Sequence, residues 1–277
     1  MIAAVLGAGG LLGRRVVREL GATARPLTRA ECDITNADDV HRATTGATLI
    51  VNCAAWTDVD GAEANVDAAF RVNAIGAENA ARAAHAHGAK LVHVSTGFVF
   101  DGAEDRPYDE FDLPHPLSVY GRSKWAGEQL VLAACDRVFI LRLQSLYGVG
   151  GKNFASSLRA RILAGKPLTM DAHRPAQPTW SGAAARQILH LAATDFYGTY
   201  NATCGGETTW AAFARAMAEH LKVEPYWSEV TTDAIGATAV RPKNHVLARR
   251  MLALRGLDVM SDWAIALTEY LEEAGQA

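Results

Sequence analysis

The protein has 277 residues, a length that suits one large domain or two modest ones. Its 27 basic and 30 acidic residues give a formal net charge of −3, which excludes a broad basic surface for nucleic acid. Hydrophobic residues make up 49% and charged residues 21% of the chain. These values are typical of globular proteins and exclude extended disorder.

Neither a membrane span nor an export signal is predicted. Gly7 to Gly10 interrupt the apolar start of the chain, and no later run reaches about 18 apolar residues. The cysteines form no CxxC pair and the histidines lack metal-ligand spacing, so we expect no metal site and no disulfide framework. The four cysteines are Cys32, Cys53, Cys135 and Cys204. We therefore expect a cytoplasmic protein with reduced thiols.

Short apolar runs alternate with helical patterns in the first half of the chain. Strands are predicted at residues 2–6, 24–27, 49–52, 90–94 and 137–143, and helices at 11–20, 64–87 (with a break near Asn73) and 118–134. This alternation predicts an α/β fold with a Rossmann-type, doubly wound parallel sheet in a domain of residues 1–150. Residues 151–277, with helices at 153–164, 181–193, 209–220 and 261–274, predict a smaller, mostly helical substrate-binding cap, some of which returns to the main domain.

A glycine-rich loop follows the first predicted strand. Gly7, Gly10 and Gly13 lie between that strand and the turn of helix that begins at Leu11 and Leu12. Such a loop makes a tight turn, lets the backbone approach a pyrophosphate and packs the helix closely on the strand, with the anion at the helix N-terminus. The loop therefore predicts a dinucleotide site, the alternative being an ordinary turn.

The end of the second strand decides between NADPH and NADH. No acid stands there, and Arg29 follows the strand instead. A guanidinium suits a 2′-phosphate, whereas Asp33, at the sequence distance of a ribose-binding acid, comes after the strand. We therefore expect NADPH, with NADH as an alternative. An ordinary surface charge is the other interpretation of Arg29.

Tyr120 and Lys124 are four residues apart in a predicted helix, so they share one face. An ammonium beside a phenol favours the phenolate, and such a phenol exchanges a proton with a carbonyl or an alcohol near neutral pH. The preceding strand ends at Ser95 and Thr96, where a hydroxyl would reach the same oxygen. A glycine loop, a strand-end hydroxyl and Tyr-x-x-x-Lys in this order indicate hydride transfer with a nicotinamide.

These motifs, with several others, resemble the extended short-chain dehydrogenase/reductase family and, within it, the dTDP-4-dehydrorhamnose reductase branch. The matching residues lie between Gly7 and about Leu247. They are residues 51–60 (VNCAAWTDVD), 72–74 (VNA), 92–102 (VHVSTGFVFDG), 107–110 (PYDE), 120–128, 147–148, 153–154, 178–179 and 241–244 (RPKN). The resemblance implies NADPH-dependent reduction of the 4-keto group of a nucleotide-linked deoxysugar.

The resemblance also assigns roles to single residues. Thr96 would hydrogen-bond the reacting oxygen, Tyr120 would be the general acid, and Lys124 would hold the nicotinamide ribose and lower the pKa of Tyr120. Further cofactor contacts would come from Asp33 and Ile34 beside the adenine, from Ala54, Ala55 and Trp56, and from Asn73. Asn153 and Arg241 would hold the sugar nucleotide, and Arg241 suits its diphosphate by charge.

The sequence departs from the branch where the sugar should lie. Gly97 and Phe98 stand where relatives usually carry Asp-Tyr, and Ser145 stands where they usually carry a tryptophan. The segment before Pro178 also differs. The cofactor half keeps its motifs, so the reaction is expected to be the same while the deoxysugar stays open.

Two other functions stay open, a non-catalytic NADP-binding regulatory subunit of this fold and a sugar-nucleotide epimerase with a retained cofactor. The presence of both Tyr120 and Lys124 favours an enzyme. A homodimer is a further open expectation. Among residues outside the motif roles, His93 is expected in the core and Glu128 on the surface of its helix.

Overall fold

The computed structural model describes residues 2–151, 153–230 and 238–276. Its main sheet has six strands in the order β10-β5-β4-β3-β1-β2, and every pairing between them is parallel. The strands are β1 (Ala3–Leu6), β2 (Ala24–Leu27), β3 (Leu49–Asn52), β4 (Lys90–Thr96), β5 (Val138–Leu143) and β10 (Gly198–Asn201). The predicted α/β doubly wound sheet is therefore confirmed.

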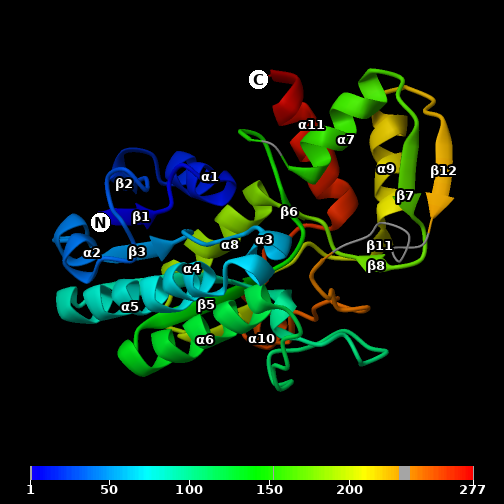
Figure 1. Ribbon diagram of the computed structural model, residues 1–277. Coiled ribbons are helices and arrows are strands. Elements are labelled where there is room, and N and C mark those ends of the chain that lie inside the picture. Colours follow the sequence, from blue (N-terminus) through cyan, green and yellow to red (C-terminus); the bar gives the residue numbers. More distant parts are fainter. Residues whose placement is uncertain (1, 152, 231–237, 277) are drawn as a thin grey trace.

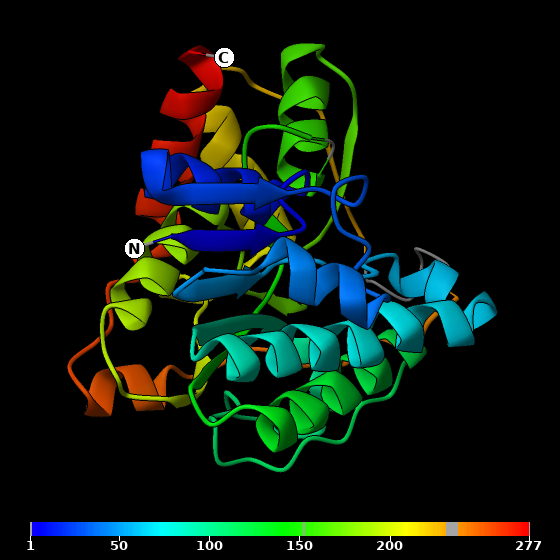
Figure 2. The ribbon, with the colours of Figure 1, turned by 90° about the vertical axis from the view of Figure 1, so that its left-hand side faces the viewer.

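Helices cover both faces of this sheet (Figures 1 and 2). One face packs against α1 (Leu11–Leu20), α8 (Ser181–Ala192) and α11 (Trp263–Gln276), and the other against α2 (Ala37–Ala43), α5 (Gly76–His87) and α6 (Val119–Ala134). Alternate residues of a strand point to opposite faces, so Val5 joins the first core and Leu6 the second. Burial on both sides explains why the strands are continuous apolar runs.

The predicted long helix over residues 64–87 is divided. The structure has α3 (Val59–Ala64), α4 (Val66–Phe70), a π-helical turn (Arg71–Ile75) and then α5. Such turns carry one extra residue and often lie at functional sites. This one contains Asn73, so the predicted break near that residue is confirmed.

A second layer of the molecule holds α7 (Phe154–Leu163), α9 (Trp210–His220) and three strand pairs (Figure 1). The pairs are β7 (Leu168–Asp171) with β12 (Trp227–Val230), β8 (Pro175–Ala176) with β11 (Thr208–Thr209), and β6 (Leu146–Tyr147) with β9 (Thr179–Trp180). This region is thus less helical than predicted. Part of the chain after residue 150 returns to the main sheet, where β10 pairs with β5 and the short helix α10 (Arg250–Leu254) packs beside β10.

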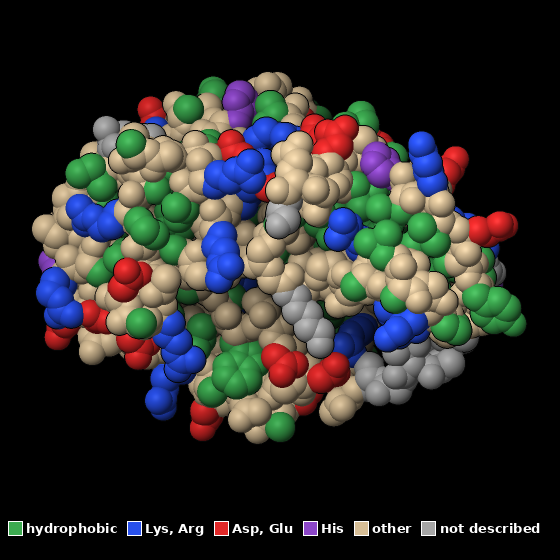
Figure 3. Space-filling model, turned by 90° about the horizontal axis from the view of Figure 1, so that it is seen from above, with side chains coloured by type: hydrophobic (Ala, Val, Ile, Leu, Met, Phe, Trp, Pro, Cys, Tyr) green, Lys and Arg blue, Asp and Glu red, His purple; other side chains and the backbone are tan. Residues whose placement is uncertain are grey.

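Charged side chains of both signs are interspersed on the face seen in Figure 3, without one large basic area. Within the described residues, no helix is both long enough and apolar enough to cross a membrane, and no group of three or more His, Cys, Asp and Glu side chains is arranged to hold a metal ion. All four cysteines are free thiols.

Candidate active site

The glycine loop forms a turn that has no room for side chains. Gly7 has φ +75°, and a Cβ at this position would lie 2.6 Å from the backbone nitrogen of Ala54. A Cβ on Gly13 would lie 2.2 Å from the carbonyl oxygen of Gly7. Gly10 precedes α1 without a side-chain cap, and no acid stands in the first turn of the helix, which begins at Leu11. Uncapped N–H groups without a competing carboxylate fit a pyrophosphate.

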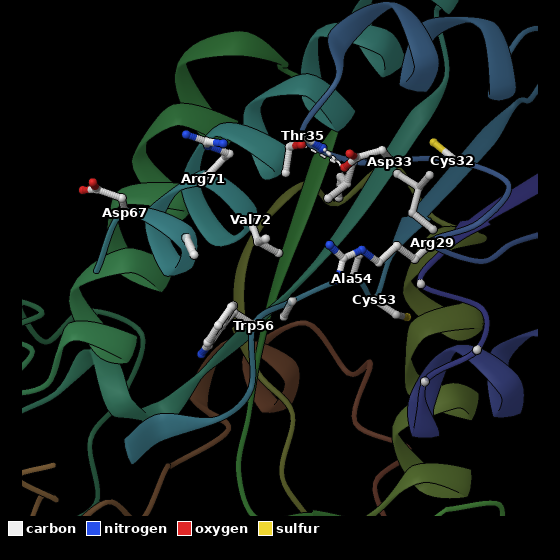
Figure 4. A pocket seen from close by; sticks show the side chains of 17 residues that line it. Arg29, Cys32, Asp33, Thr35, Cys53, Ala54, Trp56, Asp67, Arg71 and Val72 are labelled. Atoms are coloured by element: carbon white, nitrogen blue, oxygen red, sulfur yellow. Dashed lines mark hydrogen bonds between the residues drawn. The ribbon is translucent and has the colours of Figure 1, made fainter. Parts of the chain in front are cut away.

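A cavity of about 690 Å³ opens beside this loop (Figure 4). Eight of the predicted cofactor-binding residues line this cavity. They are Gly7, Gly10, Arg29, Asp33, Ile34, Ala54, Ala55 and Trp56. The sequence analysis missed further lining residues, Cys53, Thr35, Asp67 and Arg71 among them. Arg71 carries no motif of its own, and only the π-helical turn brings it here. We refer to this cavity as the cofactor trough.

The charged groups around Asp33 combine both signs. The Asp33 carboxylate accepts hydrogen bonds from the Thr35 N–H at 2.9 Å and from the Thr35 hydroxyl at 2.8 Å. These bonds lower the pKa of Asp33, and the nearby Arg29 and Arg71 lower it further. The trough thus holds two guanidinium groups, Arg29 and Arg71, beside the acids Asp33 and Asp67, and a guanidinium is a suitable partner for a phosphate.

Asn73 holds the wall of the trough from behind. Its side chain is 1% exposed, accepts a bond from the Trp56 N–H at 2.8 Å and donates to the Trp56 carbonyl at 3.1 Å and to the Ser123 hydroxyl at 2.9 Å. The structure thus places this residue, which was expected to meet the cofactor, one layer behind it. Asn73 fixes Trp56 and ties it to α6.

Thr96 and Tyr120 come together at the end of β4. Ser118 caps α6 by accepting a bond from the Gly121 N–H at 3.1 Å, which sets Tyr120 in the first turn. Burial raises the pKa of Tyr120, and a hydrogen bond from the Thr96 side chain opposes this rise. Lys124 is not among the causes of this shift, so its predicted effect on the pKa of Tyr120 stays a prediction. A phenol that stays protonated suits proton donation.

Lys124 is 2% exposed and donates to the Val94 carbonyl oxygen at 2.6 Å. Burial lowers its pKa to about 8, although Glu128 and Cys53 favour the charged form. The ammonium therefore lies between β4 and the trough, since Cys53 lines that cavity. Lys124 does not itself line the trough, so its predicted contact with the nicotinamide ribose stays a prediction.

Lys124→Met is expected to stabilise the fold at pH 7 while removing activity. Burial lowers the pKa of Lys124 from 10.5 to about 8, and each unit in pKa is worth about 1.4 kcal/mol, so the buried ammonium costs up to about 3 kcal/mol. Methionine keeps the length of the side chain without the charge. Urea unfolding measures the gain, with the exposed Lys166 replaced by Met as the matched control.

The stability that Lys124→Met gains over wild type should decrease as the pH rises. Below pH 8 both the folded and the unfolded chain hold the Lys124 proton, so the full cost is present. As the pH rises from 8 toward 10.5, the folded chain releases the proton first, and the difference between wild type and Lys124→Met should shrink. A difference that stays constant over this range would contradict the assignment.

A second cavity of about 690 Å³ lies between the main sheet and the smaller layer. Its lining residues are mainly apolar, five of them aromatic, with charged groups at intervals. It is lined by Val59, Asp60, Phe98, Ser145, Leu146, Tyr147, Phe154, Thr169, Met170, Asp171, Arg174, Trp210, Phe213, Arg241, Pro242 and His245. The predicted residues Phe98, Ser145 and Arg241 are thus brought together, and we refer to this cavity as the substrate cavity.

Three predicted substrate residues differ in how they serve this cavity. Arg241 pairs with Asp60 at 2.7 Å. Ser145 has φ +47°, an uncommon backbone conformation for a residue other than glycine that is often found at functional sites. Asn153 caps α7, accepts from the Ser156 N–H at 3.1 Å and donates to the Gly148 carbonyl at 2.8 Å. Its amide is therefore engaged within the protein, and the neighbouring Phe154 lines the cavity.

Glu128 is buried, so its expected place on the helix surface is wrong. It is 1% exposed and forms an ion pair with Arg142 of β5 at 2.7 Å, and it also accepts a bond from Ser95. His93, by contrast, is in the core as predicted, with Nδ1 3.1 Å from the Asn52 amide. The Glu128–Arg142 pair joins α6 to strand β5 of the sheet.

Comparisons with known proteins agree with this architecture. Residues 1–276 match the family described as RmlD substrate binding domain. The chain is 38% identical to a dTDP-4-dehydrorhamnose reductase of Streptomyces griseus, over 96% of this chain and 91% of that protein. It is 37% identical to a dTDP-4-keto-6-deoxy-D-glucose reductase of Streptomyces niveus, over 96% of this chain and 94% of that protein.

A solved structure gives the same result. The crystal structure of a Bacillus anthracis dTDP-4-dehydrorhamnose reductase in complex with NADP superimposes with a TM-score of 0.95 at 35% identity, and the match covers 99% of this chain and all of that one. The resemblance drawn from the motifs is thereby confirmed over nearly the whole length. The chain belongs to the RmlD substrate binding domain family, together with the dTDP-4-dehydrorhamnose reductases it resembles.

Proposed function

We propose that the protein reduces the 4-keto group of a nucleotide-linked deoxysugar with NADPH. The observation that carries the proposal is the position of α6 between the two cavities. Lys124 lies near Cys53, which lines the cofactor trough, and Tyr120 contacts Phe98, which lines the substrate cavity, at 5.7 Å between ring centres. A single helix thus presents an acid and a cation at the junction of two ligand sites.

The reaction needs one hydride and one proton. NADPH, when bound in the trough, supplies the hydride to the carbonyl carbon. Tyr120 then donates its hydroxyl proton to the carbonyl oxygen, where negative charge develops, and Thr96 donates a hydrogen bond to the same oxygen. Lys124 holds the ribose and so aligns the two reactants.

The names of relatives support this reaction class. The Streptomyces griseus and Streptomyces niveus proteins are named as reductases of dTDP-linked keto sugars, and the Bacillus anthracis structure contains NADP. The trough here has the free helix N-terminus and the guanidinium groups that such a cofactor requires.

The direct test is a panel of 4-keto sugar nucleotides with NADPH, followed by absorbance at the nicotinamide band. A reductase consumes NADPH in proportion to product. An epimerase would change the sugar without net consumption, and a regulatory subunit would bind NADPH and turn over nothing. Either of these results would replace the proposal.

Arg29→Ala should weaken NADPH binding far more than NADH binding. A guanidinium in the trough would contact the 2′-phosphate, which NADH lacks. A charge-assisted hydrogen bond corresponds to a loss of about 10-fold or more in affinity. Fluorescence titration of both cofactors measures this, with the exposed Arg82 replaced by Ala as the control. Equal losses of affinity for NADPH and NADH would contradict the assignment of Arg29 to the 2′-phosphate.

The altered substrate cavity leads to a further prediction. By the resemblance, Ser145 stands where relatives usually carry a tryptophan, and Gly97 stands where they usually carry an aspartate. We therefore expect dTDP-4-dehydrorhamnose to be reduced less efficiently than another 4-keto-6-deoxysugar nucleotide. Comparing kcat/KM across the panel measures this. Efficient reduction of dTDP-4-dehydrorhamnose, with no better substrate in the panel, would show that the departures are tolerated.

Two further statements stay predictions of the sequence, a cytoplasmic location and a homodimer. Light scattering of the purified protein tests the dimer.

A further inference from the structure

His245 stands in the wall of the substrate cavity with part of its hydrogen-bonding capacity unused. It is 8% exposed and lines the cavity together with Phe98 and Arg174. Its Nδ1 atom is buried and has no hydrogen-bond partner among the described residues. Native proteins seldom leave a buried polar atom unpaired, and Tyr147 and Asp171, which also line this cavity, each have another such atom.

The backbone around His245 is held by bonds that do not involve the imidazole. The Val246 carbonyl accepts from the Tyr108 N–H at 2.9 Å, and the Val246 N–H donates to the Asn244 side chain at 3.0 Å. Leu247 exchanges two hydrogen bonds with the buried amide of Gln177, at 2.8 and 3.1 Å. The ring is therefore carried on a fixed segment, as a preorganised binding group would be.

This segment passes directly over the residue that follows catalytic Thr96. A Cβ on Gly97 would lie 3.3 Å from the Leu247 side chain and 3.5 Å from the His245 carbonyl oxygen. A carboxylate side chain at position 97, as relatives usually carry, would need the space that the segment occupies. The glycine thus lets the histidine segment pack close to the catalytic strand end.

The His245 ring is one aromatic ring away from the catalytic phenol. Its centre is 6.0 Å from that of Phe98, which in turn is 5.7 Å from that of Tyr120. His245 and Tyr120 therefore both pack against Phe98, and a group bound to the imidazole would belong to the same sugar as the oxygen that Tyr120 protonates. Because Tyr120 is assigned to the carbonyl oxygen, the imidazole would meet a group on a different carbon of that sugar.

The imidazole is neutral at neutral pH. Burial, with a smaller contribution from the charge of Arg174, lowers the pKa of His245 to about 4. A neutral imidazole offers one donor and one acceptor. A hydroxyl group can pair with either nitrogen, as donor or as acceptor, whereas an anionic phosphate can only accept.

We propose that His245 binds a hydroxyl group of the sugar ring at a carbon other than the one that is reduced. The inference rests on the proposed function, because it takes the substrate cavity as the sugar site. His245 is then a specificity-determining residue. A sugar that lacks this hydroxyl would leave the imidazole unpaired and be selected against.

The kinetic test compares His245→Phe with His245→Gln on the 4-keto sugar nucleotide that wild type reduces best. For His245→Phe we expect KM to rise about 10-fold or more, with kcat within about 3-fold and NADPH affinity unchanged. Glutamine restores a donor and an acceptor, so His245→Gln should recover part of the loss. The matched control is the exposed His190 replaced by Phe. An unchanged KM in His245→Phe would overturn the inference.

A second measurement uses the wild-type protein, so it decides the matter even if a variant fails to fold or no substrate is reduced. Imidazole nitrogen resonances are recorded by NMR on histidine-labelled protein with NADP⁺, before and after addition of dTDP-glucose or of dTDP alone. We expect one imidazole to shift with dTDP-glucose and not with dTDP. The absence of a shift, or the same shift with dTDP, would overturn the inference, whereas failure of the panel to yield a substrate would overturn only the proposed function.

Discussion

Tyr120→Phe is expected to lower kcat by about 10²–10⁴-fold, the contribution typical of a positioned general acid. The substitution removes only the hydroxyl that would donate the proton, and it keeps the ring that contacts Phe98. The fold and NADPH affinity should therefore survive. Steady-state kinetics on the best substrate, with cofactor titration, separate these effects.

Thr96→Val is the companion variant. Thr96 forms a hydrogen bond with Tyr120. With substrate bound, its one hydroxyl proton would instead be donated to the carbonyl oxygen, so loss of the hydroxyl should slow the chemical step with little change in NADPH binding. Near-full activity in Tyr120→Phe would show that another group supplies the proton.

Glu128→Ala is expected to lower the free energy of unfolding by about 3–5 kcal/mol, because it leaves a buried arginine without its counter-charge. Arg142 keeps only 4% of its side-chain surface exposed, and it bonds Glu128 through Nε and Nη2. One remaining guanidinium nitrogen, Nη1, already has no partner among the described residues. Urea unfolding of wild type and variant measures the loss.

Two controls separate burial from pairing. Glu78→Ala breaks the exposed helical pair Glu78–Arg82, and such pairs are worth less than about 1 kcal/mol. The double replacement Glu128→Leu with Arg142→Met removes both charges, and it should be less destabilising than Glu128→Ala alone. If Glu128→Ala and Glu78→Ala had equal effects, the buried pair would not stabilise the joint between α6 and the sheet.

The sequence by itself determined the architecture and the catalytic motifs. The alternation of apolar runs and helical patterns predicted the parallel sheet, because strands covered on both faces must be apolar throughout. The glycine loop could be predicted because the steric requirement at Gly7 and Gly13 is mostly local. The shared face of Tyr120 and Lys124 could be predicted because an α-helix has a fixed period. Even the break near Asn73 was visible in the pattern.

Only the tertiary structure decided the burial and the partners of the polar residues. Glu128 looked like a surface residue until β5 brought Arg142 to it, and the burial that raises the pKa of Tyr120 was not predictable from its sequence position. Strand β10, whose sequence GTYN lacks an apolar run, was found only through its pairing with β5.

The physical reason is common to these cases. Desolvation and ion pairing depend on contacts between residues distant in the chain, such as Asp60 and Arg241, which are 181 positions apart, and no local pattern encodes such contacts.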